Sequence, residues 1–345
     1  MELKSRKFDL HLAHTWTIAR GGGDISRVVL LELKDADGVI GLGEASPVGR
    51  YQESTESVQA FLAKVDPEEL SFADPAASMD YLSRVAPGNA AAKCALNIAL
   101  LDGAARRARQ PIYDQLGLGF TENHHVTSFS IGIDSPDVVR EKVLAAEQYP
   151  VLKLKLGSDQ DAANLGALRE VAPDKPVRVD ANEAWKTRDE ALKKIEWLAR
   201  DAHIQFVEQP MPADSTPHDL AWLKQRSPLP LFADESYHSA GHAAHCAEFF
   251  HGVNVKLGKA YGISGAYNAL RAARAAGLQT MIGCMIETSV LISAAAQLAE
   301  LADHLDLDGN LLITNDPYVG VSAHRGILSF ANAPDPFGLR VAARR

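Results

Sequence analysis

From about residue 125 onward, short apolar runs alternate with segments of helical periodicity. The eight runs span residues 126–133, 151–156, 177–179, 204–207, 229–232, 253–257, 278–282 and 305–307. Ser135 and Pro136 open the first helical segment, as a capping residue followed by a proline at the first helical position. Eight strands alternating with about seven helices predict an α/β fold, a modified TIM barrel of (β/α)7β type. An open doubly wound sheet is the alternative, but Gly41-Leu42-Gly43 lacks the third glycine of the dinucleotide-binding motif.

The first ~118 residues follow another pattern, in which strands precede helices. Residues 28–33 and 39–43 flank the turn signal Asp35-Ala36-Asp37-Gly38 and predict a hairpin. Helices are expected near residues 54–65, 75–85 and 89–108. Gly21, Gly22 and Gly23 indicate a mobile connection before the hairpin, either a plain linker or a lid.

We therefore expect an α+β capping domain over residues 1–120, a catalytic barrel over residues 121–318, and a carboxyl-terminal segment, 319–345, that returns to the capping domain. Substrate specificity loops would belong to the capping domain, with residues 48–53 and the glycine-rich segment covering the site.

The composition is that of a globular enzyme, with 46% hydrophobic and 23% charged residues. The net charge of −9 disfavours nucleic acid as a partner, and no apolar run is long enough for a membrane span. Three widely separated cysteines, Cys94, Cys246 and Cys284, do not suggest a disulfide scaffold. We expect a cytoplasmic protein. The sequence leaves open whether the chain forms a homo-oligomer.

Charged residues stand where the predicted barrel strands end. They are Lys153, Lys155, Asp180, Asn182, Glu208, Asp234, Glu235 and Lys256. The three acidic positions 180, 208 and 234 are separated by 28 and 26 residues, about one β/α unit each. Because active sites of β/α barrels form at the carboxyl ends of the strands, these side chains are expected to meet at one mouth.

The carboxylates of Asp180, Glu208 and Asp234 would repel one another unless a cation lay between them. Hard oxygen ligands favour Mg²⁺, one ion per subunit, and the alternative is an ion-pair network with the lysines alone. Side chains alternate across a strand, so Lys153 and Lys155 both point into the barrel.

Lys256 would approach the metal from the side opposite Lys155. Two such lysines suit a stereoinversion in which one removes a proton from a carbon and the other returns a proton to the opposite face. Burial and a nearby cation should lower the pKa of both lysines. A magnesium ion on a substrate carboxylate would stabilise the enediolate that forms.

These motifs together resemble the muconate-lactonizing subgroup of the enolase superfamily. The resemblance rests on Lys153-Leu154-Lys155, Val179-Asp180-Ala181-Asn182, Val207-Glu208-Gln209-Pro210, Ala233-Asp234-Glu235-Ser236, Asn254-Val255-Lys256 and Met285-Ile286-Glu287-Thr288. Within the subgroup, His304-Leu305-Asp306-Leu307-Asp308 is similar to the Asp-x-Asp motif of dipeptide epimerases.

The resemblance implies a magnesium-dependent dipeptide epimerase that inverts the α-carbon of the carboxyl-terminal residue, with L-Ala-D/L-Glu as the expected substrate. It implies Lys155 and Lys256 as the acid/base pair and Lys153 as a group that neutralises the substrate carboxylate. Asp306 and Asp308 would bind the substrate ammonium. The remaining expected site residues are Arg20 for the glutamate side chain, Ser130, Cys284 and Ile286 as pocket lining, and Asn182 and Glu235 in support.

Two other functions remain open. An o-succinylbenzoate synthase or a cycloisomerase would use the same lysines, although its substrate carries no ammonium for Asp306 and Asp308. A catalytically silent binding barrel is the more remote alternative.

Overall fold

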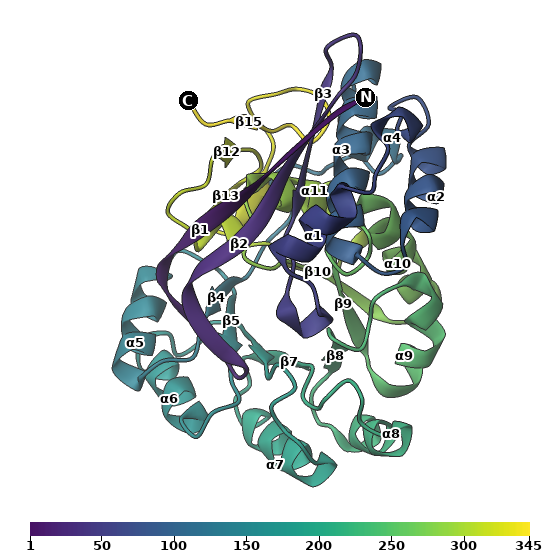
Figure 1. The fold of residues 1–345 in the computed structure, drawn as a ribbon. Helices are drawn as coiled ribbons and strands as arrows, with labels where there is room; N and C mark the ends of the chain where they lie inside the picture. The colour runs from purple at the N-terminus through teal and green to yellow at the C-terminus, as the bar shows by residue number, and fades with distance from the viewer.

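Eight parallel strands form the barrel in the order in which they occur along the chain. The computed structural model describes all 345 residues (Figure 1). The strands are β4 (Phe129–Ile131), β5 (Leu152–Lys155), β6 (Val177–Asp180), β7 (Ile204–Glu208), β8 (Leu231–Ala233), β9 (Gly252–Lys256), β10 (Gln279–Gly283) and β11 (His304–Asp306). Each overlaps one predicted apolar run. The seam between β11 and β4 is held by a bridge between Thr127 and Leu305 and by a 3.1 Å hydrogen bond from the Ser128 amide to the Leu305 carbonyl.

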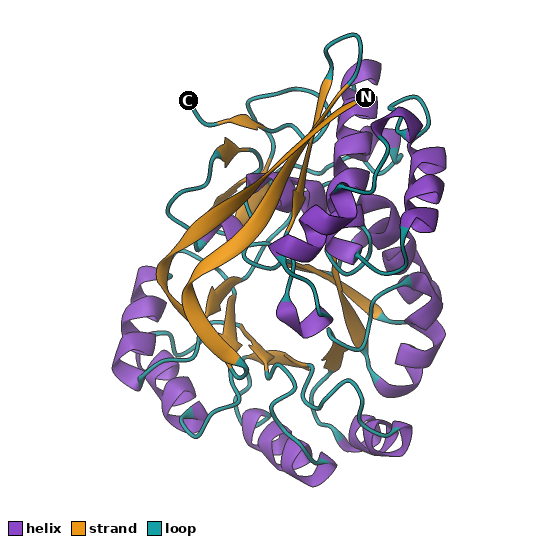
Figure 2. Cartoon of the chain, viewed as in Figure 1, coloured by secondary structure: helices purple, strands orange, loops and turns teal.

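Seven helices surround this barrel (Figure 2). They are α5 (Pro136–Ala145), α6 (Asp161–Val171), α7 (Arg188–Leu198), α8 (Pro217–Arg226), α9 (Ala243–Phe249), α10 (Ile263–Ala275) and α11 (Ser289–Ala296). Ser135 is the N-cap residue of α5 as predicted, but its side chain makes no capping hydrogen bond. No α-helix follows β11, because the chain continues into one 3-10 turn and then short strands.

The capping region begins with an antiparallel sheet of β1 (Glu2–Ile18), β2 (Gly21–Lys34) and β3 (Ile40–Ala45). Three of its helices, α1 (Thr55–Leu62), α2 (Pro75–Val85) and α3 (Ala90–Ala108), lie close to the predicted segments. The fourth, α4 (Ile112–Gln115), was not predicted. The sequence did not predict β1, since most of its residues are exposed or only half-buried and the apolar signal is weak.

The glycines at positions 21–23 form part of a strand and not a connecting loop, which corrects the prediction. They lie in β2 and pair with Trp16, Thr17 and Ile18 of β1. Their partner in the sheet is β1, which the sequence did not predict. The glycines alone therefore gave no reason to expect a strand at this position.

The carboxyl-terminal tail contains β12 (Tyr318–Val319), β13 (Ser322–His324), β14 (Ile327–Ser329) and β15 (Ala342–Ala343). It packs on α3, where Arg106 forms a 2.5 Å ion pair with Asp335 and the Leu339 amide donates to Asp102 over 2.7 Å. The predicted fold class is therefore confirmed, with an α+β cap built from both ends of the chain.

Five short 3-10 turns complete the structure, at Gly49–Tyr51, Pro67–Glu69, Ala240–His242, Ala299–Leu301 and Gly309–Leu311. None of the helices combines the length and the apolar character needed to cross a bilayer.

Candidate active site

Three buried carboxylates meet at the carboxyl ends of adjacent strands. Asp180 ends β6, Glu208 ends β7, and Asp234 follows β8 directly. Asp180 and Glu208 are register partners, and one oxygen from each of the three residues lies within 4.8 Å of the others. The predicted convergence is thus present in the structure, because consecutive parallel strands place their last residues side by side.

The surroundings of these carboxylates fit a divalent cation. Burial and the charge of Asp180 raise the pKa of Glu208 to about 7, so the negative charge is incompletely compensated. Glu208 Oε2 lies 2.8 Å from Lys153 Nζ but accepts no hydrogen bond. Three convergent hard oxygen donors are the ligand set that Mg²⁺ accepts, with other positions left for water and substrate.

Two lysines flank the carboxylates from opposite sides. Lys155, at the end of β5, places Nζ 2.6 Å from Asp180, and Lys256, at the end of β9, places Nζ 3.0 Å from Asp234. Strands β5 and β9 lie on either side of β6, β7 and β8 in the sheet order. Both lysines line a cavity of about 190 Å³ at the barrel mouth, so two ammonium groups face one ligand-sized space.

The pKa of Lys256 does not show the expected lowering, because acidic side chains surround this lysine. Burial lowers the pKa of Lys256, but the charges of Asp234, Tyr51 and Glu208 together raise it by more, and the net shift is upward. Spacing along the sequence showed that a charged group would be near, but not that the Asp234 carboxylate would form a direct ion pair with the lysine.

Lys153 lies deeper than predicted. Its side chain is 1% exposed, with Nζ 2.7 Å from Asp306, 2.8 Å from Glu208 and 3.3 Å from Asp180. Lys153 is not among the residues that line the cavity. It therefore compensates the charge of three carboxylates of the protein, whereas the sequence suggested contact with a substrate carboxylate.

Asp306 and Asp308 both line the cavity but differ in their partners. Besides Lys153, Asp306 accepts a 2.7 Å hydrogen bond from the hydroxyl of Ser128. Asp308 accepts a 2.6 Å hydrogen bond from the Ser130 amide and forms no ion pair. Burial and the charge of Asp306 raise the pKa of Asp308 to about 6. A cation bound beside Asp308 would lower this pKa again. Asp308 is thus the carboxylate better placed to receive an ammonium group.

Arg20 lies between β1 and β2 at the tip of the hairpin and is engaged by the barrel. Its guanidinium donates to the Asn182 carbonyl over 2.9 Å and forms ion pairs with Glu235 at 2.7 Å and Glu183 at 3.2 Å. Arg20 also lines the cavity, as the sequence led us to expect. Its charge is nevertheless already balanced by two carboxylates of the protein.

Glu183 and Arg50 were not found from the sequence. Arg50, in the covering segment 48–53, donates through Nε and Nη2 to the two oxygens of Glu183, each over 2.8 Å. Glu183 has a positive φ of 66° and a nearly buried side chain that also holds Arg20. The sequence offered two indications of this contact, a glutamate directly after the predicted Asn182 and an arginine within the covering segment 48–53. Glu183 fastens both covering segments to the barrel.

The predicted lining residues Ser130, Cys284 and Ile286 are all found in the cavity wall. Trp16, which the sequence did not single out, places its ring centroid 5.9 Å from the Nζ of Lys155. Asn182 lines the cavity, and its backbone N–H donates to Asp180 Oδ1 over 2.9 Å, which helps to orient that carboxylate.

One wall of the cavity is held from the capping region by Glu44 of β3. Its fully buried carboxylate accepts hydrogen bonds from the Thr288 amide at 2.9 Å, the Thr288 hydroxyl at 2.5 Å and the Leu291 amide at 3.2 Å. Ser46 donates to the Ile286 carbonyl over 3.2 Å. These contacts fix the segment from Cys284 to Thr288 at the start of α11.

Comparison with known families places both parts of the chain. The family described as "Mandelate racemase / muconate lactonizing enzyme, N-terminal domain" matches residues 6–117. The family described as "Enolase C-terminal domain-like" matches residues 137–316.

Individual relatives match over nearly the whole length. The chain is 65% identical to an L-Ala-D/L-amino acid epimerase of Pedosphaera parvula, with 100% of both chains covered. It is 41% identical to an L-Ala-D/L-Glu epimerase of Bacteroides thetaiotaomicron over 97% of this chain and 86% of the relative.

Solved structures show the same arrangement. A substrate-liganded L-Ala-D/L-Glu epimerase from Bacillus subtilis superimposes with a TM-score of 0.92 at 27% identity, covering 99% of this chain and 98% of that one. A dipeptide epimerase from Enterococcus faecalis, complexed with Mg and L-Leu-L-Tyr, gives a TM-score of 0.89 at 29% identity and covers 99% of both chains.

Proposed function

The chain belongs to the mandelate racemase/muconate lactonizing enzyme family of the enolase superfamily, and from this premise we propose that it is a magnesium-dependent dipeptide epimerase. Its substrates are L-Ala dipeptides such as L-Ala-D/L-Glu, and it inverts the α-carbon of the carboxyl-terminal residue. The observation that carries this function is the pair Lys155 and Lys256, which face one cavity from either side of the three carboxylates.

The protein's own groups account for the proton transfers. One lysine, in its neutral form, removes the α-proton from one face of the substrate carbon, and the other, as an ammonium, donates a proton to the opposite face. Asp180, Glu208 and Asp234 are the residues that would hold Mg²⁺. When bound, the ion supplies positive charge that stabilises the negative charge developing on the substrate carboxylate.

The substrate ammonium is assigned to the acidic pair at the end of β11. Asp308 accepts it directly, because this carboxylate is buried and has no cationic partner. Asp306 contributes negative charge while it holds Lys153 in place. The lack of an ammonium in o-succinylbenzoate precursors and in cycloisomerase substrates makes the dipeptide the better match to this pair.

Arg20 and the covering segment define the side-chain end of the site. We assign Arg20 to the region of the substrate's carboxyl-terminal side chain, with Ser130, Cys284 and Ile286 as further lining. Asn182 and Glu235 support the site by holding Arg20. The Asn182 carbonyl accepts a hydrogen bond from its guanidinium, and Glu235 forms an ion pair with it. Cys94, Cys246 and Cys284 are unpaired, which favours a cytoplasmic location.

Proton NMR in D₂O tests this function. L-Ala-L-Glu incubated with enzyme and Mg²⁺ is expected to lose the glutamate α-proton signal while the L-Ala-D-Glu epimer accumulates. Exchange on other L-Ala dipeptides alone would retain the mechanism and discard the glutamate preference. A lack of exchange on every dipeptide, with turnover of a succinyl-cyclohexadiene carboxylate, would replace the proposal by the synthase.

A further inference from the structure

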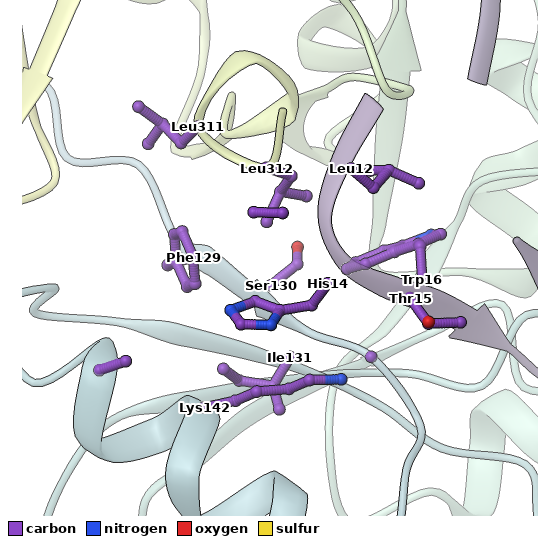
Figure 3. A pocket seen from close by; sticks show the side chains of 13 residues that line it. Leu12, His14, Thr15, Trp16, Phe129, Ser130, Ile131, Lys142, Leu311 and Leu312 are labelled. Carbon is purple, nitrogen blue, oxygen red and sulfur yellow. The ribbon is translucent and has the colours of Figure 1, made fainter. Parts of the chain in front are cut away.

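A second cavity, of about 120 Å³, shares lining residues with the substrate cavity. Figure 3 shows the side chains that line it. Eight of its 13 lining residues are hydrophobic. The leucines at positions 12, 311 and 312 lie on one side of it, and Ile131 and Lys142 on the other. Lys142 forms a 3.1 Å ion pair with Asp134, so its charge is already compensated. The imidazole of His14 lies between these two sides, but His14 and Thr15 are solvent-exposed, so the inner part of the cavity is suited to an apolar group.

An irregularity in β1 roofs this cavity. The β1–β2 register passes from His11 opposite Ile25 to Trp16 opposite Gly23, so that four residues, 12–15, stand against the single residue Asp24. Such insertions redirect a strand and its side chains, and they occur preferentially next to functional sites.

The redirected strand spans the barrel seam. The Ala13 amide donates to the Leu312 carbonyl over 2.9 Å on the β11 side, and the Ile133 amide donates to the Thr17 carbonyl over 2.8 Å on the β4 side. No α-helix follows β11, so β1 and not an eighth helix lies over the seam between β11 and β4. The cavity is the space between this strand, the seam and α5, and it opens to solvent beside Ala13 and Ala145.

Three residues, Trp16, Ser130 and Leu312, line both cavities. Trp16 also faces Lys155, and the Ser130 amide donates to Asp308. The second cavity therefore begins beside the carboxylate that we assign to the substrate ammonium. The α-carbon of the amino-terminal residue is one bond from that ammonium, so its side chain would lie next to Ser130.

We propose that this second cavity is a subsite for an apolar side chain, larger than methyl, on the amino-terminal residue of the dipeptide. The inference rests on the proposed function and deepens it. An apolar cavity of about 150 Å³ accommodates a benzene ring, so one of 120 Å³ has room for an isobutyl group. The enzyme would consequently accept L-Leu as well as L-Ala at the amino-terminal position.

Steady-state kinetics with L-Ala-L-Glu and L-Leu-L-Glu test the subsite. The unsubstituted enzyme is expected to use the leucyl dipeptide with kcat/KM no more than about ten-fold below that for the alanyl dipeptide. Ala145→Phe, in the α5 wall of the cavity, is expected to lower the leucyl-to-alanyl ratio of kcat/KM at least ten-fold. Leu144→Phe is the matched control, because Leu144 is the adjacent residue, is 54% exposed and does not line the cavity.

Ala13→Phe fills the cavity from the opposite wall and repeats the test if Ala145→Phe does not fold. The subsite is refuted if the alanyl dipeptide is epimerised while the kcat/KM for the leucyl dipeptide is more than about ten-fold lower. It is also refuted if a folded cavity-filling variant keeps the ratio of the unsubstituted enzyme. Failure of the proposed function is a different result, in which the unsubstituted enzyme exchanges the α-proton of neither dipeptide.

Discussion

Replacing Glu44 by glutamine is expected to change how the stability of the protein depends on pH. Glu44 is fully buried in the capping region, where burial raises the pKa of its carboxyl from 4.5 to about 7. An acid with a raised pKa binds its proton more tightly in the folded state. Its contribution to stability is therefore complete below pH 4.5 and is lost as the pH rises toward 7.

The size of this loss follows from the two pKa values. Each pKa unit corresponds to about 1.4 kcal/mol, so the shift removes about 2 to 3 kcal/mol of unfolding free energy between pH 5 and pH 8. The Glu44→Gln variant lacks this titration. Burial and the charge of Glu44 raise the pKa of Glu287 to about 8. Removing the charge of Glu44 lowers this pKa, so the loss of stability that the ionisation of Glu287 causes also becomes smaller in the variant.

Urea unfolding of the two proteins at several pH values measures the effect. Glutamine also changes the hydrogen bonds with Thr288 and Leu291, which shifts the variant's unfolding free energy at every pH, so only the difference in slope is diagnostic. Glu69→Gln, at an exposed position of the same region, is the control and should keep the slope of the unsubstituted protein. Parallel pH profiles for Glu44→Gln and the unsubstituted protein would refute the reasoning.

Three further predictions concern the catalytic site. Asp234→Asn removes one of three convergent carboxylates and should weaken Mg²⁺ binding about ten-fold or more in calorimetry, and an unchanged Kd would contradict its role as a ligand. Lys155→Ala should abolish α-proton exchange in D₂O from one substrate epimer and Lys256→Ala from the other. Equal loss from both epimers in both variants would contradict the assignment to opposite faces. Glu183→Gln weakens the ion pairs that hold Arg20 and Arg50, and therefore both covering segments. In initial-rate measurements, KM should rise about ten-fold more than kcat changes. An unaltered KM would show that Glu183 does not position the covering segments.

Strand positions in the barrel could be predicted because they depend on local pattern. Buried parallel strands are short apolar runs, and a charged residue that ends such a run can only stand at the barrel mouth. Asp180, Glu208 and Asp234 therefore converge as expected, and Lys155 and Lys256 flank them. The same reasoning could not find β1, whose largely exposed side chains carry little apolar periodicity.

The sequence by itself determined which residues reach the mouth of the barrel, since strand alternation and the length of a β/α unit are local properties of the chain. Only the tertiary structure decided how those residues pair. Lys153 lies against Asp306, 153 positions away, and Arg20 lies against Glu183 and Glu235, far along the chain from the hairpin tip. The second cavity likewise exists only because β1 crosses the seam between the first and last barrel strands. Ion pairs and cavities of this kind depend on packing between distant segments, which no local pattern encodes.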